Sequence, residues 1–395
     1  MVMAARPHTV VQVHARYRRS GGEEAVADAE ADLLSAHDHR VVRFHVNNAD
    51  FAERSAATTA RLAVWNRGAA AELEALVRAE RASVVHLHNT FPALSPAVVR
   101  GARAGGAAVV ATLHNYRLLC PGADLLRAGA PCEDCVGHVP WRAVVHGCYG
   151  GSRVASAVSA LTLQTHRAAG TWRQVDAFIA LTPFARDLFG RGGLPVERMH
   201  VKPNFLAADP GAGLGGEAFL FVGRLDRQKG VDVLLRAWAE LEAPPELQIV
   251  GEGPLESDVR AASIRHPSIR PLGRLPGPEV LEHMRHAAAL VVPSISYEGF
   301  PMVMAEAFAC ALPVIASDHG ALATIVEDGV NGVRVRPGDA GALAAAVRQL
   351  AGRPELRRRL GEAARRSYLD RYAAPASYAA LARIYGAALA RREEG

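Results

Sequence analysis

Two glutamates, Glu298 and Glu306, flank a segment whose residue types suit a ligand that carries both phosphate and sugar rings. The apolar run before Glu298 predicts a strand, and the mostly apolar residues 302–309 predict a helix. Gly299 lets the backbone approach a ligand, and Pro301 suits the first helical position because its missing N–H would be unpaired there. The unpaired N–H groups of a helix N-terminus favour phosphate. The carboxylates would instead accept hydrogen bonds from hydroxyl groups.

A second candidate segment follows the apolar run 219–222. It contains Arg224 and Lys229, which could meet a diphosphate from one side, arginine as a planar fork and lysine as a point charge. Lys229 and Lys202 are the only lysines in the chain, which indicates a need for a compact ammonium group, although chance survival of the two lysines would also explain them. A solvated charge cluster is the alternative. The tight turn 251–255 could let its backbone approach a base or phosphate, or could be a plain turn.

A third segment follows the first predicted strand. Gly21 and Gly22 open a predicted helix there, and the backbone N–H groups at its start could reach a phosphate. Arg16, Arg18 and Arg19 would make the surroundings positive. An ordinary turn is the alternative, because paired glycines are common in turns.

The elements that must position these segments alternate between strands and helices. The chain has 395 residues, half of them hydrophobic, which suits two domains better than one core. Nearly continuous Val, Ile and Leu runs predict parallel strands that helices cover on both faces, so the expected class is α/β with doubly wound sheets. We place an N-terminal domain at 1–207, including a Cys-rich loop at 118–150. A C-terminal domain follows at 208–375, and a last helix at 376–395 returns to the first domain.

With these segments in view, the sequence resembles the retaining nucleotide-sugar glycosyltransferases of family 4. The resemblance covers the whole chain and is most specific in 219–339, through FLFVGRLDRQKG, IVGEGPL and VVPSISYEGFPMVMAEAFA. It implies the GT-B fold, in which two Rossmann-like domains face each other across a cleft. The N-terminal half is similar to a bacterial branch that modifies polysaccharides, lipid-linked sugars or natural products.

The resemblance also implies residue roles. The implied catalytic residues are Arg224, Lys229, Glu298 and His114. Arg224 and Lys229 would neutralise the leaving diphosphate, Glu298 would bind the donor sugar, and His114 would lie by the sugar and the acceptor. The implied donor-binding residues are Gly21, Gly22, Gly223, Asn204, Leu275, Gly299, Phe300, Pro301, Met302 and Glu306. Among these, Glu306 would bind the ribose hydroxyls and the backbone of Leu275 would contact the nucleobase.

The resemblance suggests a front-face retaining mechanism with a UDP- or GDP-sugar as co-substrate. Fixed cations and a helix N-terminus can stabilise a leaving diphosphate without a metal, so no catalytic metal is expected. A sugar-nucleotide epimerase or a phosphorylase of the same fold is one alternative. A non-enzymatic sugar-nucleotide-binding protein is another, although it would predict a degraded donor site.

Four of the five cysteines lie close together in the sequence, at Cys120, Cys132, Cys135 and Cys148. A Cys-x-x-Cys pair flanked by one further cysteine on each side resembles a four-thiolate structural zinc site. Reduced thiols, a disulfide and an iron–sulfur cluster are alternatives. His86 and His88 share one face of a predicted strand, but packed or cleft-lining histidines are more common than a metal pair, so we assign them no metal.

The bulk properties restrict the partners. A net charge of +5 permits contact with anionic substrates or a membrane face, and no aromatic platform for nucleic-acid bases accompanies it. We find no secretory signal and no apolar stretch of the ~20 residues that span a bilayer. The expected location is the cytoplasm, and the expected partners are a nucleotide sugar and a small-molecule or glycan acceptor.

Overall fold

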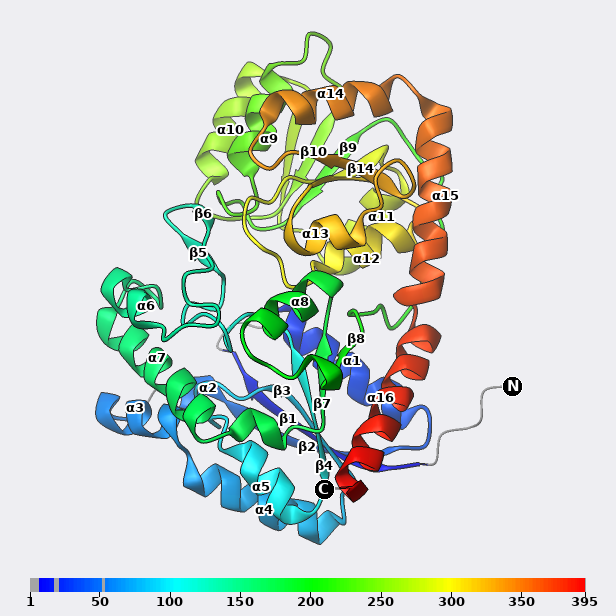
Figure 1. Ribbon diagram of the computed structural model, residues 1–395. Helices are drawn as coiled ribbons and strands as arrows, with labels where there is room; N and C mark the ends of the chain where they lie inside the picture. The colour runs from blue at the N-terminus through cyan, green and yellow to red at the C-terminus, as the bar shows by residue number, and fades with distance from the viewer. Residues whose placement is uncertain (1–6, 18–20, 52–53, 395) are drawn as a thin grey trace. The chain divides into compact units, whose positions relative to one another are not determined.

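The computed structural model describes residues 7–17, 21–51 and 54–394, which form two compact units (Figure 1). The N-terminal unit contains the described residues up to Leu125, then Glu133–Pro203 and the residues from Ser377 onward. The C-terminal unit contains Leu126–Cys132 and Asn204–Ala376. The chain passes into the C-terminal unit at Asn204, a few residues before the boundary expected at 207.

A six-stranded parallel sheet forms the centre of the N-terminal unit, in the order β2-β1-β3-β4-β7-β8. Its strands are β1 (Thr9–Arg16), β2 (Arg40–Asn47), β3 (Val84–Asn89), β4 (Ala108–Leu113), β7 (Ala177–Ala180) and β8 (Met199–Val201). Every residue of β3 and β4 is buried, as expected for a parallel sheet that is covered on both faces. This burial explains the continuous apolar runs that predicted the strands.

Helices cover this sheet and connect its strands. They are α1 (Gly22–Ser35), α2 (Asn48–Phe51), α3 (Ala56–Val64), α4 (Arg67–Glu80), α5 (Val98–Gly105), α6 (Trp141–His146), α7 (Arg153–Ala168) and α8 (Pro183–Arg191), with short 3-10 turns at Thr171–Gln174 and Val196–Arg198. The start of α4, α7 and α8 is fixed by the side chains of Asn66, Ser152 and Thr182, each of which accepts a hydrogen bond from a first-turn N–H. A two-stranded hairpin, β5 (Leu126–Arg127) and β6 (Ala130–Pro131), precedes α6.

The last two helices are α15 (Pro354–Arg371) and α16 (Ala374–Glu394). Pro375 is the second residue of α16, where its missing N–H breaks no helical hydrogen bond. The core of the N-terminal unit contains Leu381, Ile384, Tyr385 and Ala388 of α16 together with Val10, Val84, Val110 and Ile179 of the sheet. The C-terminal helix therefore packs on the sheet that begins at the other end of the chain.

The C-terminal unit repeats the architecture with the strand order β11-β10-β9-β12-β13-β14, again parallel. The strands are β9 (Phe219–Val222), β10 (Leu247–Val250), β11 (Ile269–Gly273), β12 (Ala289–Val292), β13 (Val314–Ser317) and β14 (Gly332–Val335). The helices are α9 (Val231–Ala239), α10 (Glu256–Arg265), α11 (Gly277–Arg285), α12 (Met302–Ala309), α13 (Gly320–Ile325) and α14 (Ala340–Ala351), followed by α15. Trp238 is fully buried in its core.

The expected fold class is confirmed: each unit is a Rossmann-like α/β domain with six parallel strands. Among the described residues, no helix combines the length and the apolar character that crossing a bilayer requires.

Candidate functional site

The C-terminal unit has a binding position that follows from its strand order. From β9 the chain proceeds outward to β10 and β11, and it then returns to place β12 on the other side of β9. The loops after β9 and β12 therefore leave in opposite directions, and the crevice between such loops is where doubly wound sheets bind ligands. These two loops carry Arg224, Lys229 and Glu298, so the fold brings together the charged residues that the sequence singled out.

Lys229 and Glu298 form an ion pair in this crevice. The Lys229 Nζ lies 2.8 Å from Glu298 Oε1 and 2.9 Å from Oε2. Ser294 donates its hydroxyl to Glu298 Oε1 at 2.7 Å. The Lys229 side chain is 33% exposed and the Glu298 side chain 13%, so the pair is accessible from one side and supported from the other. The carboxylate is thus held in one orientation before any ligand contacts it.

The two loops are also joined through their backbones. The N–H of Ile295 donates to the carbonyl of Gln228 at 2.9 Å. Gly230 has a left-handed φ of 72°, and a Cβ there would collide with the carbonyl oxygen of Pro293. Asp226 accepts a hydrogen bond from the Lys229 N–H at 2.9 Å. The position of Lys229 is therefore fixed by its own loop and by the loop that carries Glu298.

Arg224 differs from Lys229 in its surroundings. Its Nε lies 2.9 Å from Asp226 Oδ2, and its side chain is 68% exposed. An exposed ion pair of this kind contributes little to stability, so the guanidinium can exchange Asp226 for another anion at low cost. The preceding residue, Gly223, donates its N–H to the carbonyl of Val250 at 3.0 Å.

The glycines of the 251–255 turn have a packing role. A Cβ on Gly251 would collide with the carbonyl oxygen of Gly223, and one on Gly253 would lie 2.6 Å from the carbonyl oxygen of Leu225. The close neighbour of this backbone is the loop after β9, and its approach to a base or phosphate stays a prediction. The turn therefore supports the segment that holds Arg224.

Glu306 lies on α12, the helix that follows the β12 loop. Burial raises the pKa of its carboxyl group. Within the described part of the chain, its carboxylate has no hydrogen-bond partner. Since burying an unpaired carboxylate is costly, the position is explained if a ligand donates hydrogen bonds to it.

The predicted helix at 302–309 is confirmed, with one correction at its start. Met302 is the first helical residue, and Pro301 is the N-cap, with an extended ψ of 117°. The prediction that Pro301 is the first helical residue was therefore wrong by one position. Gly299 is half-buried, whereas Phe300 is buried with its ring 5.5 Å from that of Tyr372.

Two other donor-binding candidates of the C-terminal unit lie farther along the chain. Leu275 is half-buried in the loop after β11, and Asn204 is buried where the chain passes from the N-terminal unit into the C-terminal unit. These placements leave their predicted ligand contacts untested.

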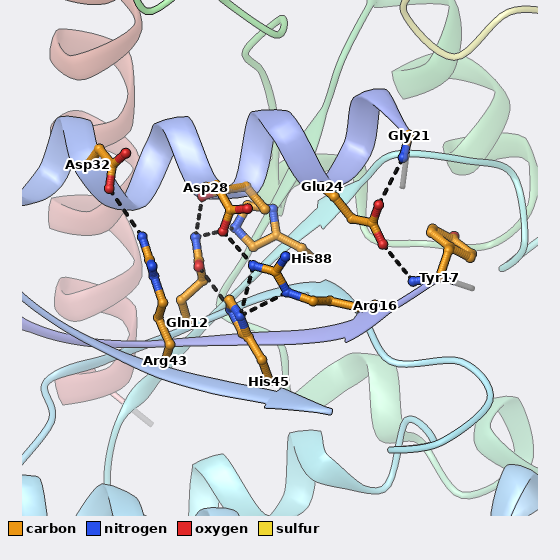
Figure 2. Close-up of polar contacts among 11 residues, drawn as sticks. Gln12, Arg16, Tyr17, Gly21, Glu24, Asp28, Asp32, Arg43, His45 and His88 are labelled. Atoms are coloured by element: carbon orange, nitrogen blue, oxygen red, sulfur yellow. Dashed lines mark hydrogen bonds and ion pairs between the residues drawn. The ribbon is translucent and has the colours of Figure 1, made fainter. Parts of the chain in front are cut away.

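At the glycine pair after β1, the Gly21 N–H group has a different partner from the phosphate that the sequence predicted. Gly21 is the N-cap of α1, and its N–H donates to Glu24 Oε2 at 2.8 Å. The other oxygen of Glu24 accepts the N–H of Tyr17 at 2.6 Å (Figure 2). Glu24 is buried and already satisfies the Gly21 N–H that was expected to face a phosphate. The capping box that Glu24 forms three residues after Gly21 was the overlooked sequence signal.

The arginines near this helix also differ from the expectation. Arg16 donates to Asp28 Oδ1 at 2.6 Å and lies 3.4 Å from His45 Nδ1, so it is bound within the N-terminal unit (Figure 2). Arg18 and Arg19 lie outside the described residues. Arg16 is therefore paired with an acidic residue and does not supply the free positive charge that was predicted near Gly21.

Beneath α1, a buried charged network occupies the carboxyl-terminal half of the N-terminal sheet. Glu30 Oε2 lies 2.9 Å from Lys202 Nζ, and its Oε1 lies 2.9 Å from His86 Nδ1 and 3.4 Å from His88 Nε2. The side chains of Glu30 and Lys202 are only 2% and 4% exposed. Although burial raises the pKa of Glu30, Lys202 and His86 together hold it well below its usual value. Glu30 is therefore a carboxylate, and Lys202 is its counter-ion.

This network extends to His114. His88 Nδ1 lies 2.9 Å from His114 Nε2, and His88 Nε2 faces both the Glu30 carboxylate and Gln12 Nε2 at 3.5 Å. We assign the His88 proton to Nε2, because an N–H that donates to the charged Glu30 carboxylate makes a stronger hydrogen bond than Nε2 would make by accepting an N–H of the Gln12 amide. His88 Nδ1 then accepts from His114 Nε2–H, which leaves His114 Nδ1 as an acceptor. Burial lowers the pKa of His114 well below its usual value, so the ring is neutral.

Glu23 is a further titratable group near the start of α1, and sequence reasoning missed it. Its Oε2 accepts from the Tyr17 hydroxyl at 3.2 Å and from Asn115 Nδ2 at 3.4 Å. Its Oε1 is buried without a hydrogen-bond partner among the described residues. Burial raises the pKa of Glu23 to about 7, so the group changes charge near neutral pH. Asn115 directly follows His114, which places Glu23 close to a predicted site residue.

The four clustered cysteines all belong to the described part of the chain, and no disulfide joins them. Cys120 and Cys135 are buried, whereas Cys132 and Cys148 are half-buried. Within the described residues, the single group of three or more possible ligands with atoms within 4.8 Å of one another consists of Glu30, His86 and His88. The four sulfurs therefore do not converge as a ready tetrahedral site would, and zinc binding by them is not shown.

Glu30, His86 and His88 are spaced closely enough to hold a metal ion, but their partners argue for a different role. Lys202 already neutralises the carboxylate, and His86 Nε2 lies 2.7 Å from Thr112 Oγ1. A divalent ion would add two charges to a dry interior that is already neutral, at high cost. The choice to assign no metal to His86 and His88 is therefore retained.

Comparison with known proteins relates part of this chain to a family of glycosyltransferases. Residues 216–353 match the family described as "Glycosyl transferases group 1". The chain is 39% identical over 145 residues to the uncharacterized glycosyltransferase MJ1178 of Methanocaldococcus jannaschii, an alignment that covers 36% of this chain and 40% of that protein. It is 30% identical over 296 residues to D-inositol 3-phosphate glycosyltransferase 1 of Catenulispora acidiphila, covering 69% of this chain and 64% of that protein. The chain thus spans less than two thirds of either relative.

A solved structure resembles this chain in its fold. Anabaena Alr3699/HepE in complex with UDP has a TM-score of 0.67 to this chain at 15% identity, with 95% of this chain and 98% of that chain covered. Residues 216–353 are thus similar to the glycosyl transferases group 1 family, and the two parallel-sheet units have the fold of GT-B glycosyltransferases.

Proposed function

We propose that the chain is a glycosyltransferase that moves a sugar from a nucleotide diphosphate sugar to a hydroxyl or other nucleophile of an acceptor. The observation that carries this proposal is the Lys229–Glu298 ion pair in the crevice between the loops after β9 and β12. It offers an ammonium group for a diphosphate and a carboxylate for sugar hydroxyls at one position. The pair also lies within the residues that match the group 1 family.

In the proposed reaction, the bond between the sugar C1 and the phosphate oxygen breaks, and its electron pair stays on the diphosphate. The acceptor oxygen forms the new bond to C1, and its proton passes to the leaving phosphate oxygen. We assign retention of configuration by this front-face route, as in family 4. Lys229 and the exposed Arg224 would stabilise the developing charge, which requires no catalytic metal.

The remaining roles divide between the two ends of the donor. Glu306 would accept hydrogen bonds from the ribose, and its unpaired, partly buried carboxylate supports this role. The backbone of Gly223 and of 299–302 would hold the sugar and diphosphate, and that of Leu275 the base. UDP is the favoured nucleotide, because HepE binds UDP and shares the fold, and GDP is the alternative.

The other site residues are assigned roles around the sugar, the phosphate and the acceptor. His114 would contact the reacting sugar or the acceptor through its Nδ1, the atom that the buried network leaves as an acceptor. Gly22 is retained as a phosphate contact, whereas the N–H of Gly21 is used by Glu24. Asn204 would line the donor site. The acceptor class is a glycan, a lipid-linked sugar or a natural product.

A donor screen tests the proposal. Purified protein is incubated with UDP-, GDP- and dTDP-sugars in the presence of a chelator, and both thermal stabilisation and release of the nucleotide diphosphate are measured. We expect one nucleotide series to stabilise the protein and to be hydrolysed slowly without added metal. Proton NMR of the released or transferred sugar would show the α or β configuration of the donor retained. The proposal is wrong if no series binds, and metal independence is wrong if turnover requires added Mg²⁺ or Mn²⁺.

A further inference from the structure

The N-terminal unit exposes an apolar surface on α6 and α7. Of the ten exposed large apolar side chains in the described part of the chain, half fall between residues 139 and 161. They are Val139, Trp141, Val145, Val154 and Leu161. Scattered single apolar residues are normal on a protein surface, but a cluster of this kind marks an interaction site.

The spacing of these residues gives each helix one apolar side. Trp141 and Val145 are four residues apart on α6 and are 59% and 50% exposed. Val154 and Leu161 are seven residues apart on α7 and are 76% and 57% exposed. Residues at these spacings lie on the same side of a helix. The two helices pack against each other, and α3 packs against α7, so the three helices lie side by side (Figure 1).

The charges around this surface have one sign. Residues 54–71 and 135–175 contain no Asp or Glu, although the whole chain has 40. The same two segments contain seven arginines: Arg54, Arg61, Arg67, Arg142, Arg153, Arg167 and Arg173. Arg61, Arg67 and Arg153 are exposed and form no ion pair with a described acidic residue. The apolar surface is therefore bordered by arginines whose charge is not neutralised locally.

A groove beside this surface has the same mixed character. Its volume is about 1370 Å³, and it is lined by Val158 and Leu161 of α7 together with Trp65, Arg61 and Arg67. Asp50 and Glu72 are its acidic lining residues, against four arginines. The groove could receive lipid headgroups or acyl segments at the edge of the apolar surface.

We propose that the α3–α6–α7 surface docks on an anionic lipid bilayer. Apolar and aromatic side chains flanked by arginines are the features that hold a protein in the bilayer interface without spanning it. Trp141 suits the headgroup level, because an indole ring has an apolar body and a polar N–H. A protein partner with a large apolar surface is the alternative, but nothing in that alternative requires the exclusion of acidic residues from both segments. The proposal goes beyond the glycosyltransferase reaction and does not depend on it.

The direct test is co-sedimentation of the full chain with vesicles. The probes are phosphatidylcholine vesicles and phosphatidylcholine vesicles containing about 30 mol% phosphatidylglycerol, a content that gives a negative surface potential. We expect binding to the anionic vesicles only, and loss of that binding when salt shortens the Debye length from about 8 Å to about 3 Å. Absence of binding to anionic vesicles would overturn the proposal and leave the surface to a protein partner.

Variants locate the contact. W141S/V145S and R61S/R153S change exposed positions, so the melting temperature should stay unchanged. Each arginine near an anionic surface contributes about a fivefold change in affinity, so R61S/R153S should weaken binding at least about tenfold and flatten its salt dependence. The matched control is I264S, because Ile264 is 83% exposed on α10 of the C-terminal unit. Equal binding by all four proteins would overturn the assignment.

Fluorescence gives an independent measurement. Trp172 and Trp238 are buried, and Trp65 is half-buried, so Trp141 is the most exposed of the four tryptophans. Anionic vesicles should shift the tryptophan emission to shorter wavelength. The W141F variant should keep vesicle binding and lose most of this shift. Retention of the full shift in W141F would contradict insertion at α6, and a change in oligomeric state in W141S/V145S would instead indicate an interface between copies of the chain.

Discussion

The Nζ of Lys229 lies within 2.9 Å of both carboxylate oxygens of Glu298, although the two residues are 69 positions apart in the sequence. The pair joins the two loops that leave the sheet at its reversal of strand order. Each residue therefore orients the other. A ligand that contacts one of the two charges will also interact electrostatically with the other. Loss of either residue should consequently affect both charge stabilisation and sugar positioning.

Replacing Lys229 or Glu298 by Ala is expected to lower the turnover number by about a hundredfold or more, because each acts where charge or sugar geometry changes in the transition state. The measurement is the steady-state rate with the donor that the nucleotide screen identifies. The matched control is Glu256→Ala, which breaks an exposed ion pair with Arg260 on α10 of the same unit. Rates near those of the unaltered protein in both crevice variants would rule out the proposed site.

Glu306 should reveal its burial through the pH dependence of stability. Its folded-state pKa is raised, so the carboxylate form is disfavoured in the folded protein, and stability falls as pH rises from the unfolded pKa through the folded pKa. Glu306→Gln removes this penalty. The variant should therefore be more stable than the unaltered protein at neutral pH. The difference in stability should shrink towards zero below pH ~4, where the side chain at this position is uncharged in both proteins. Denaturant unfolding at several pH values measures this, and a constant difference would contradict it.

The same residue should affect donor binding more than turnover. Ribose contacts bind the ground state and the transition state alike, so Glu306→Ala should raise the Michaelis constant for the donor and leave the turnover number nearly unchanged. A loss confined to turnover would show that Glu306 does not contact the ribose.

The crevice could be predicted from the sequence because its parts are local. Arg224, Lys229 and Glu298 each follow an apolar strand within a few residues, and parallel strands place such loops at one edge of a sheet. The start of α12 was predicted to within one residue for the same reason. What the sequence could not show is that the glycines at 251 and 253 pack against the neighbouring loop, because that contact depends on strand order.

The N-terminal site was predicted less well because its contacts are distant in sequence. Lys202 pairs with Glu30 across 172 positions, and no local pattern reports such a pair. The rarity of lysine was the available signal, and the structure shows Lys202 buried in an ion pair with Glu30. Gly21 was misjudged because its neighbour Glu24, three positions along, satisfies the N–H expected to face a ligand.

The Glu30–Lys202 pair leads to a prediction about stability. Lys202→Met would leave a buried carboxylate without its counter-ion, so we expect a loss of about 3–5 kcal/mol in the free energy of unfolding. The double variant Glu30→Gln with Lys202→Met removes both charges and should recover part of that loss. Denaturant unfolding of the two single variants and the double variant measures the coupling. If the changes in the two single variants add up to the change in the double variant, the two groups do not interact as the 2.9 Å distance indicates.

The four clustered cysteines lead to the last prediction, which concerns metal content. The spacing of Cys120, Cys132, Cys135 and Cys148 still predicts one structural zinc, but the structure does not gather their sulfurs. Binding would therefore require the loop to rearrange, and the metal would contribute to its folding because a closed four-thiolate site has no open position for water. Elemental analysis of the purified protein should give about one zinc per chain.

Variants of the same protein separate this prediction from non-specific thiol binding. Cys132→Ser should lower both the zinc content and the melting temperature. Cys310→Ala is the matched control, because Cys310 is a buried cysteine beyond the cluster, at the end of α12, and its loss should leave the zinc content unchanged. Metal-free protein that is as stable as the unaltered preparation would eliminate the zinc prediction. That result would leave the proposed donor site intact, because the Lys229–Glu298 crevice contains none of these cysteines.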